Sequence, residues 1–416
     1  MSFRWLRLCA LGLVVTLVAA ACGSSSSSST SSASSSSSSA SASASSTTST
    51  SAASTPTISS SQFSADLSAM SSLKPLASQG KGKVAAILPD TVTSTRYVEF
   101  DAPYITKALT LAGLSSSDII VQNAQGSDTT QFTDAQSDIT NGATVLLVDP
   151  LDPGVGARIE AYAKSHGVAT IDYDRLTLGG SRSYYVSFDN VLVGKTMGQG
   201  MVTCLASWKV TKPNILVMHG AVTDNNATLF YQGYYDQVLK PLFTSGKATD
   251  AGHPAGTWDP PTALTSFQAA FTKDSKINAA LIPNDENAAP IITYLKTHGI
   301  KAKTFPTTGQ DATLTGLQNI LTGYQCGTVY KPIYLEAEGA TALAMYLRAG
   351  KTPPASLVNG ATQDTTSHVS VPSILETPIW VTPANMDSTV IKDKFVPAAQ
   401  LCTGAAAAGC KAAGIS

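Results

Sequence analysis

Charged residues are scarce in this sequence. Lysine, arginine, aspartate and glutamate together make up 13% of its 416 residues, and the formal net charge is -1. Proteins that bind nucleic acid usually present a strongly basic face, so the composition argues against nucleic acid as a partner. Catalytic signatures are missing as well: there is no GxSxG elbow, no HExxH, no Walker loop and no GxGxxG after the first expected strand. We therefore expect no catalytic residues and no cofactor.

Metal-ligating residues are sparse too. No CxxC spacing occurs, and the five histidines are scattered along the chain without the spacing of a zinc site. They are His166, His219, His253, His298 and His368. We expect no metal site.

Only the N-terminus carries a long apolar run, and that run is too short to be a good membrane span. Arg4 and Arg7 precede the apolar residues 8–18 and the three alanines 19–21, which is the pattern of a secretory signal peptide. Cys22 follows directly, and this arrangement resembles the lipobox of bacterial lipoproteins. We predict that residues 1–21 are removed and that Cys22 carries lipid, which places the protein on the outer face of the cytoplasmic membrane. An ordinary secretory peptide with a chance cysteine is the alternative.

The next segment is almost entirely serine, alanine and threonine, from Ser24 to about Pro56. It has no large apolar residue whose burial could offset the entropy lost on ordering. We predict that residues 22–80 form a flexible tether for a folded body that begins near Lys81.

Four cysteines remain beyond the tether: Cys204, Cys326, Cys402 and Cys410. An even number outside the cytoplasm favours disulfides. Cys402 and Cys410 flank a short loop rich in glycine and alanine, so they form the natural local pair. Cys204 with Cys326 follows only by elimination, and two free buried thiols are the alternative.

Short β-branched runs alternate with longer amphipathic stretches through the rest of the chain. Expected strands cover residues 83–88, 119–122, 144–148, 168–171, 214–218, 279–282 and 328–330, and helices are expected at 97–112, 129–141, 154–166 and 286–298. Strands separated by helices predict βαβ units and parallel sheets. Because the total exceeds what one open sheet usually carries, we expect an α/β fold of two doubly wound lobes.

Polar clusters follow several of these strands, at the sheet edge where such folds bind ligands. Asp174 and Arg175 can accept from and donate to sugar hydroxyls, and Trp258 can cover the apolar face of a pyranose. Each cluster also has an ordinary structural interpretation. Asp174 and Arg175 could close a surface turn, Trp258 could be a packing residue, and Asn225 or Asn226 could simply start a helix.

The order of these clusters resembles the periplasmic sugar-binding family of type I fold, in particular its xylose-binding members. The matching stretches are Ile171–Arg175, Tyr185–Asn190, Asp224–Ala227, Leu229–Phe230, Val238–Pro241, Asn284–Asp285, Gly309–Ala312 and Thr328–Ile333. The resemblance covers essentially residues 83–395. It implies sugar contacts from Arg96, Tyr97, Asp174, Arg175, Asn225 or Asn226, Trp258, Asn284, Asp311 and Lys331.

The resemblance also implies a domain layout. Residues 81–188 with 332–350 would form the N-terminal lobe, and 189–331 with 351–395 the C-terminal lobe, leaving 396–416 as a cysteine-containing extension. Three strands would join the lobes as a hinge, crossing near Phe188–Asp189, near Lys331 and after the helix that ends around Arg348. Closure of the lobes over the sugar would then be a hinge motion.

The function implied is that of the substrate-binding subunit of an ABC sugar importer. Such a subunit is a monomer that passes a monosaccharide, here D-xylose or a similar aldose, to a membrane permease powered by an ATPase. The loop Pro89–Thr95 carries only Asp90 as a charge, and Tyr97 replaces a larger aromatic of xylose binders, so glucose, arabinose and ribose stay open. A sugar sensor for chemotaxis or for a two-component receptor is the alternative role, and a carbohydrate-active enzyme is a third.

The lipid anchor can be tested at Cys22. Replacing it by serine (Cys22→Ser) removes the thiol that would carry the lipid, so the variant should leave the membrane fraction while its body folds normally. Cell fractionation and the intact mass of the wild-type protein measure this. Retention of the variant in membranes, together with no lipid mass on the wild type, would end the hypothesis.

Overall fold

The computed structural model describes residues 55–416, so Cys22 and the tether up to residue 54 lie outside the described part. The first lobe is built on a seven-stranded sheet in the order β10-β11-β5-β4-β3-β1-β2, in which only β10 is antiparallel to its neighbour. Its strands are β1 (Lys83–Leu88), β2 (Ile119–Asn123), β3 (Ala143–Val148), β4 (Ala169–Tyr173), β5 (Tyr184–Phe188), β10 (Gly360–Gln363) and β11 (Ser370–Glu376).

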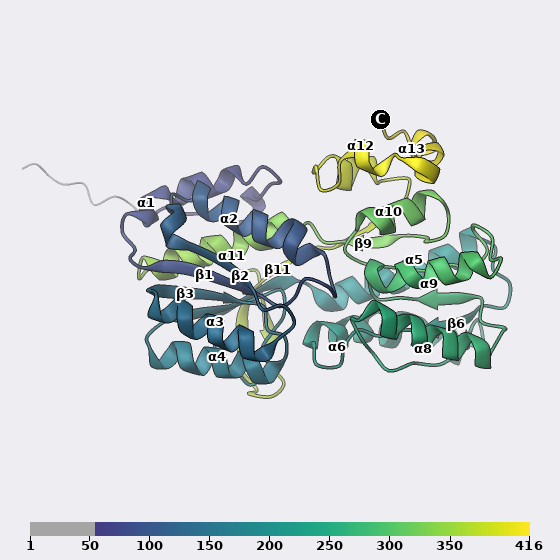
Figure 1. The fold of residues 1–416 in the computed structure, drawn as a ribbon, viewed down its shortest axis with the longest axis horizontal. Coiled ribbons are helices and arrows are strands. Elements are labelled where there is room, and N and C mark those ends of the chain that lie inside the picture. The colour runs from purple at the N-terminus through teal and green to yellow at the C-terminus, as the bar shows by residue number, and fades with distance from the viewer. Residues whose placement is uncertain (1–54) are drawn as a thin grey trace, which may run out of the picture. The chain divides into compact units, whose positions relative to one another are not determined.

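Helices cover both faces of this sheet (Figure 1). On one face lie α2 (Ala102–Leu111), preceded by a π-helical turn at Tyr97–Asp101, and α11 (Ile333–Arg348). On the other lie α3 (Asp128–Thr140) and α4 (Pro153–Ser165). Val84 and Ala86 of β1 pack toward the first pair of helices and Ala85 and Ile87 toward the second, which explains why this strand is apolar throughout.

The second lobe has a smaller parallel sheet in the order β7-β6-β8. Single bridges from Ala280 to Thr307 and from Gln310 to Val329 continue it toward the antiparallel pair β9 and β12. The strands are β6 (Asn214–Val217), β7 (Thr249–Asp250), β8 (Ala279–Leu281), β9 (Thr328–Tyr330) and β12 (Ile379–Val381). The helices are α5 (Asn190–Ser207), α6 (Asn225–Tyr231), a π-helical segment (Gln232–Leu239), α7 (Lys240–Thr244), α8 (Pro260–Lys273), α9 (Asp285–Thr297) and α10 (Leu314–Leu321).

The predicted α/β class with two doubly wound lobes is confirmed. Two of the predicted crossings also occur as expected, at Phe188–Asn190 between β5 and α5 and at Tyr330–Ile333 between β9 and α11. No helix within residues 55–416 combines the length and the apolar character that a bilayer span requires.

The third predicted crossing was wrong. After α11 the chain does not pass to the second lobe but forms β10 and β11, and Ile374 of β11 pairs with Val186 of β5 in the first sheet. The crossing follows between Glu376 and Ile379, where β11 leads into β12. Residues 351–376 therefore belong to the first lobe, because β11 pairs in parallel with the edge of β5 and β10 pairs with β11.

The tether was also predicted too long, because residues 55–80 pack on the first lobe. They form short helices at Ser60–Gln62, Ser68–Leu73 and α1 (Lys74–Ala77). Leu67, Met70, Leu73 and Leu76 are fully buried against α2 and α11. Burial of these large side chains supplies the free energy that the serine-rich residues upstream cannot gain.

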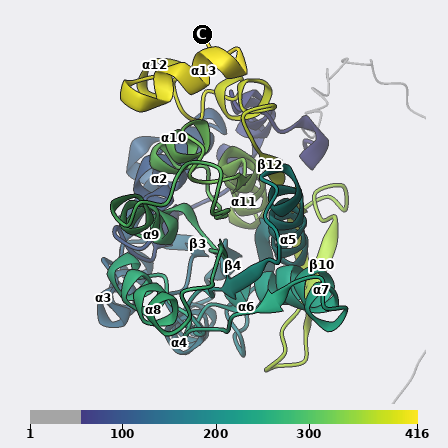
Figure 2. The same ribbon diagram turned by 90° about the vertical axis from the view of Figure 1, so that its right-hand side faces the viewer.

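The C-terminal extension packs on the second lobe, where Figures 1 and 2 show α12 (Ala398–Leu401) and α13 (Ala407–Ala413) beyond α10. Leu401, Cys410 and Ile415 share a buried cluster with Leu317 and Ile320 of α10. Two disulfides are present, Cys402–Cys410 within the extension and Cys204–Cys326 between α5 and the segment before β9. These are the two pairs named from the sequence.

Candidate functional site

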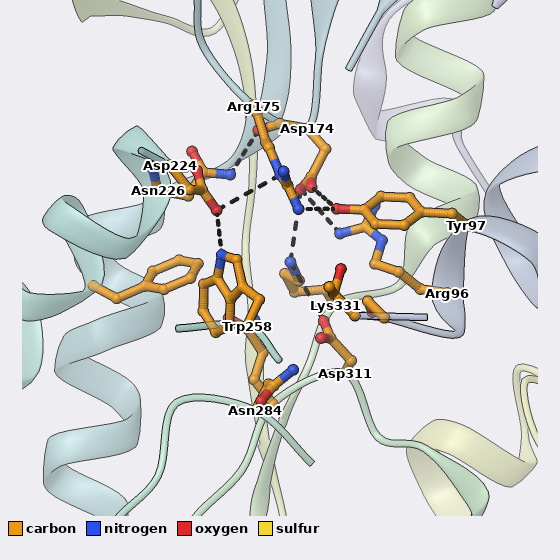
Figure 3. Close-up of a pocket in the computed structure, with 14 residues that line it drawn as sticks. Arg96, Tyr97, Asp174, Arg175, Asp224, Asn226, Trp258, Asn284, Asp311 and Lys331 are labelled. Carbon is orange, nitrogen blue, oxygen red and sulfur yellow. Dashed lines mark hydrogen bonds and ion pairs between the residues drawn. The ribbon is translucent and has the colours of Figure 1, made fainter. Parts of the chain in front are cut away.

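Polar side chains from both lobes converge on one small cavity (Figure 3). The first lobe contributes Thr93, Ser94, Arg96 and Tyr97 from the segment after β1, and Asp174 and Arg175 from the segment after β4. The second lobe contributes Asp224, Asn226 and Phe230 of the α6 region together with Trp258, Asn284, Gln310 and Asp311. Lys331 comes from a crossing between the lobes. The enclosed space measures about 30 Å³. Small-molecule pockets usually span about 300–1,000 Å³, so a ligand enters only when the walls separate.

Arg96 is held by carboxylates on three sides. It is 2% exposed, its Nη1 donates to Asp174 at 2.9 Å, and its Nε and Nη2 donate to Asp101 at 2.9 and 2.8 Å. Nη2 also donates to Glu336 at 2.7 Å. Almost all of its donors are thus used within the protein, and its main task is to position Asp174.

Asp174 adopts a backbone conformation that few residues other than glycine tolerate, with φ at +55°. Its carbonyl oxygen accepts from the hydroxyls of Tyr185 and Ser187 and from the amide of Asn226, each at 2.8 Å. Such a conformation costs on the order of 1–3 kcal/mol and persists only where the surroundings enforce it. These three donors hold the Asp174 carboxylate at the cavity wall.

The charge of that carboxylate is secured by its neighbours. Burial alone would raise the pKa of Asp174, but the cations Arg96, Lys331 and Arg175 and the hydroxyl of Tyr97 lower it below its ordinary value. The Tyr97 hydroxyl donates to Asp174 Oδ2 at 3.2 Å. Asp174 is therefore an ionised acceptor at neutral pH.

Arg175 reaches from the first lobe to the second. Its Nη2 donates to the Tyr97 hydroxyl at 3.1 Å, while its Nε lies 3.6 Å from both Asp149 and Asp224. At that distance Nε makes no hydrogen bond, and both carboxylate oxygens of buried Asp149 also lack a partner. Asp149, which follows β3, thus lies beside Arg175 without a short contact, and the Nε N–H of Arg175 is a donor without a hydrogen-bond partner.

Lys331 lies between two aspartates. Its Nζ is 3.4 Å from Asp311 and 3.7 Å from Asp174, and the residue is 3% exposed. Burial would lower its pKa, but these two carboxylates raise it, so the ammonium keeps its charge. Asp311 Oδ1, the oxygen nearest the ammonium, has no hydrogen-bond partner within the protein.

Trp258 is oriented by the second lobe. Its indole N–H donates to Asp224 Oδ2 at 3.0 Å, and its ring meets Phe230 edge to face at 6.5 Å between centroids. Asp224 Oδ1 in turn accepts from the N–H of Asn226 as the cap of α6. The Asp224 carboxylate therefore both caps α6 and fixes the orientation of the Trp258 indole.

The structure brings nine of the ten predicted site residues to the cavity and separates one. Asn226 lines it, whereas Asn225 is half-buried and points elsewhere, because neighbouring positions on a helix face different directions. Asn226 Oδ1 already accepts from Tyr185 and Asn190, so its amide mainly ties the lobes together.

Sequence reasoning missed several lining residues. They are Thr93, Ser94, Asp224, Phe230 and Gln310. Asp224, Phe230 and Gln310 stand inside the motifs that were noticed, but their roles as cap, ring partner and wall needed the fold. Within residues 55–416 no cluster of three or more histidine, cysteine, aspartate or glutamate side chains is arranged to hold a metal ion.

The comparisons with known proteins agree on one family. The profile of a family described as "Periplasmic binding protein domain" matches residues 85–352. The D-xylose-binding periplasmic protein of Escherichia coli is 36% identical over 280 residues, which is 67% of this chain and 81% of that protein. The multiple sugar-binding periplasmic receptor of Rhizobium radiobacter is 30% identical over 77% of this chain and 92% of its own length.

Solved structures show the same likeness. A carbohydrate transporter solute-binding protein of Chloroflexus aurantiacus, in complex with D-glucose, covers 76% of this chain and 97% of its own at 25% identity and a TM-score of 0.68. An ABC transporter solute-binding protein of Clostridium phytofermentans with bound β-D-glucose covers 76% of this chain and 99% of its own at 27% identity, also with a TM-score of 0.68.

The packing of Trp258 yields a test. A Cβ on Gly220 would come within 2.2 Å of the indole ring, so Gly220→Ala should push Trp258 away from Asp224. We expect unfolding free energy to fall by about 1–3 kcal/mol and tryptophan emission to shift. Urea titration followed by fluorescence measures both. Lys164→Ala, at an exposed position on α4, is the control. If Gly220→Ala behaves like that control, the indole is not packed as described.

Proposed function

The chain belongs to the periplasmic binding protein family, and we propose that it is the extracytoplasmic sugar-binding subunit of an ABC importer. On this proposal it captures one monosaccharide between its lobes, closes over it, and delivers it to a permease driven by a cytoplasmic ATPase. It acts as a monomer, reaches the membrane through lipid on Cys22 alone, and catalyses no reaction.

The observation that carries the proposal is the charge balance of the cavity. Among the residues that line the cavity, three cations, Arg96, Arg175 and Lys331, stand beside three carboxylates, Asp174, Asp224 and Asp311. Asp101 and Glu336, which also bind Arg96, do not line the cavity. An ionised ligand would leave a net charge buried, which is costly, whereas a neutral polyol adds none. The hydroxyls of a polyol can donate to Asp311 Oδ1 and accept from Arg175 Nε. Neither atom has a hydrogen-bond partner within the protein.

The aromatic wall suits a sugar ring. Trp258 is half-buried at the cavity, and its indole N–H is engaged by Asp224, so its ring is held rigidly. One face of a pyranose is apolar and packs well on such a plate, while the rim of hydroxyls meets the charged groups.

We propose D-xylose or a similar aldose as the ligand. The support is the similarity to two D-xylose-binding periplasmic proteins, at 36% and 34% identity. The relative from Rhizobium radiobacter is named a receptor, which favours a sugar-sensing role as the second candidate.

Isothermal titration with xylose, arabinose, ribose, glucose and galactose tests the proposal. One aldose should bind, and Asp174→Asn should weaken it about ten- to hundredfold, because a charge-assisted hydrogen bond of roughly 1.5–3 kcal/mol is lost. Asparagine is chosen because it tolerates the positive φ at this position better than alanine. Asp311→Asn should act in the same direction.

The control is Lys164→Ala, an exposed position on α4 that should leave the affinity unchanged. Absence of binding by every sugar, or an Asp174→Asn variant that binds as tightly as the wild type, would contradict the proposed site. Steady hydrolysis of a glycoside would instead support an enzyme.

A further inference from the structure

One contact between the lobes lies beside the cavity rather than in its lining. Glu286, in the first turn of α9 in the second lobe, faces the loop that follows β1 in the first lobe. The backbone N–H of Thr95 donates to Glu286 Oε1 at 3.1 Å, and the hydroxyls of Ser94 and Thr95 each lie 3.4 Å from the same oxygen. The side-chain amide of Asn284 donates to Oε2 at 3.0 Å.

This carboxyl group lies between the N-termini of two helices, one from each lobe. The carbonyl of Thr95 accepts from the N–H groups of Val98 and Glu99, so the helical segment that continues into α2 starts here. The N–H of Thr95 has no partner within that helix. Asn284 caps α9 by accepting from the N–H of Asn287 at 3.1 Å. The N–H of Thr95 favours an oxygen acceptor at this position, and Glu286 supplies it.

We propose that Glu286 is an interlobe latch, which ties the Ser94–Thr95 loop to α9 and slows the opening of the cleft and hence the release of the ligand. Ser94 and Asn284 line the cavity and Glu286 does not, so the latch holds two opposing walls together without contacting the ligand. The identity of that ligand rests on the proposed function, whereas the latch contact itself does not.

The surroundings of Glu286 show which variant should preserve the latch. Burial, together with the nearby carboxylates of Asp311 and Asp285, raises the pKa of Glu286 to about 8. The first lobe offers only the uncharged donors of Ser94 and Thr95, since the adjacent guanidinium of Arg96 is engaged by its own carboxylates. Glutamine therefore keeps the shape of the side chain and the acceptor oxygen that faces Thr95.

The first test needs no sugar. Hydrogen–deuterium exchange of the Thr95 amide in the full chain should be about two- to tenfold faster in Glu286→Ala than in the wild type, the factor that one net hydrogen bond supplies. Glu286→Gln should exchange like the wild type. Glu99→Ala removes an exposed carboxylate from the helical segment that follows the Ser94–Thr95 loop. It is the matched control and should leave the exchange rate of the Thr95 amide unchanged.

The second test measures release. A stopped-flow chase of the bound aldose, followed by tryptophan fluorescence, should give a dissociation rate about two- to tenfold higher in Glu286→Ala, with restoration in Glu286→Gln and little change in the association rate. Thr95 exchange equal to that of the wild type in Glu286→Ala, or failure of glutamine to restore it, overturns the latch. Failure of the wild type to bind any sugar overturns the proposed function instead, and the exchange experiment still decides the latch.

Discussion

Arg96 lies among three carboxylates, almost wholly buried, and its hydrogen bond to Asp174 at 2.9 Å links the first-lobe core to the cavity. Removing one partner of a buried ion pair is costly because it leaves an uncompensated charge. Tyr97 donates to the same aspartate, and Lys331 comes within 3.7 Å of it from a crossing. The strained backbone of Asp174 is the local cost of aiming that carboxylate at the cavity.

Two carboxylates of the second lobe lie close to the cations of the cavity without a short contact to them. Asp224 lies 3.6 Å from Arg175, and Asp311 lies 3.4 Å from Lys331. These distances give electrostatic attraction across the cleft without the short contacts of a finished hydrogen-bond network. On the proposed function, the neutral hydroxyl groups of a sugar complete that network.

The sequence predicted the parts of the fold whose signal is local. The strands β1 and β9 have the expected bounds, because each is an apolar run with polar residues at its carboxyl end. The strand β10, Gly360–Gln363, has almost no β signal and is stabilised by its pairing with β11. That pairing joins residues distant from β5 in the chain, so the third crossing could not be placed from sequence.

The site shows the same division. Strand-end clusters correctly located the cavity, since parallel strands present their carboxyl ends at one edge. The clusters could not show whether the side chain of Asn225 or of Asn226 points into the cavity. Nor could they show that Glu286, at the start of α9, accepts a hydrogen bond from the facing loop of the first lobe. Such choices depend on helix rotation and on which loop of the other lobe comes near, and neither is written in local spacing.

We propose that the cavity binds a neutral sugar. Identifying the small molecule that remains bound to the protein when it is purified from cells tests this most directly. Freshly purified protein can be denatured and the released small molecule identified by mass spectrometry. The equal numbers of cations and carboxylates among the lining residues favour a neutral ligand, and on the proposed function that ligand is an aldose. Release of an organic anion, an amino acid or another charged ligand would contradict the account.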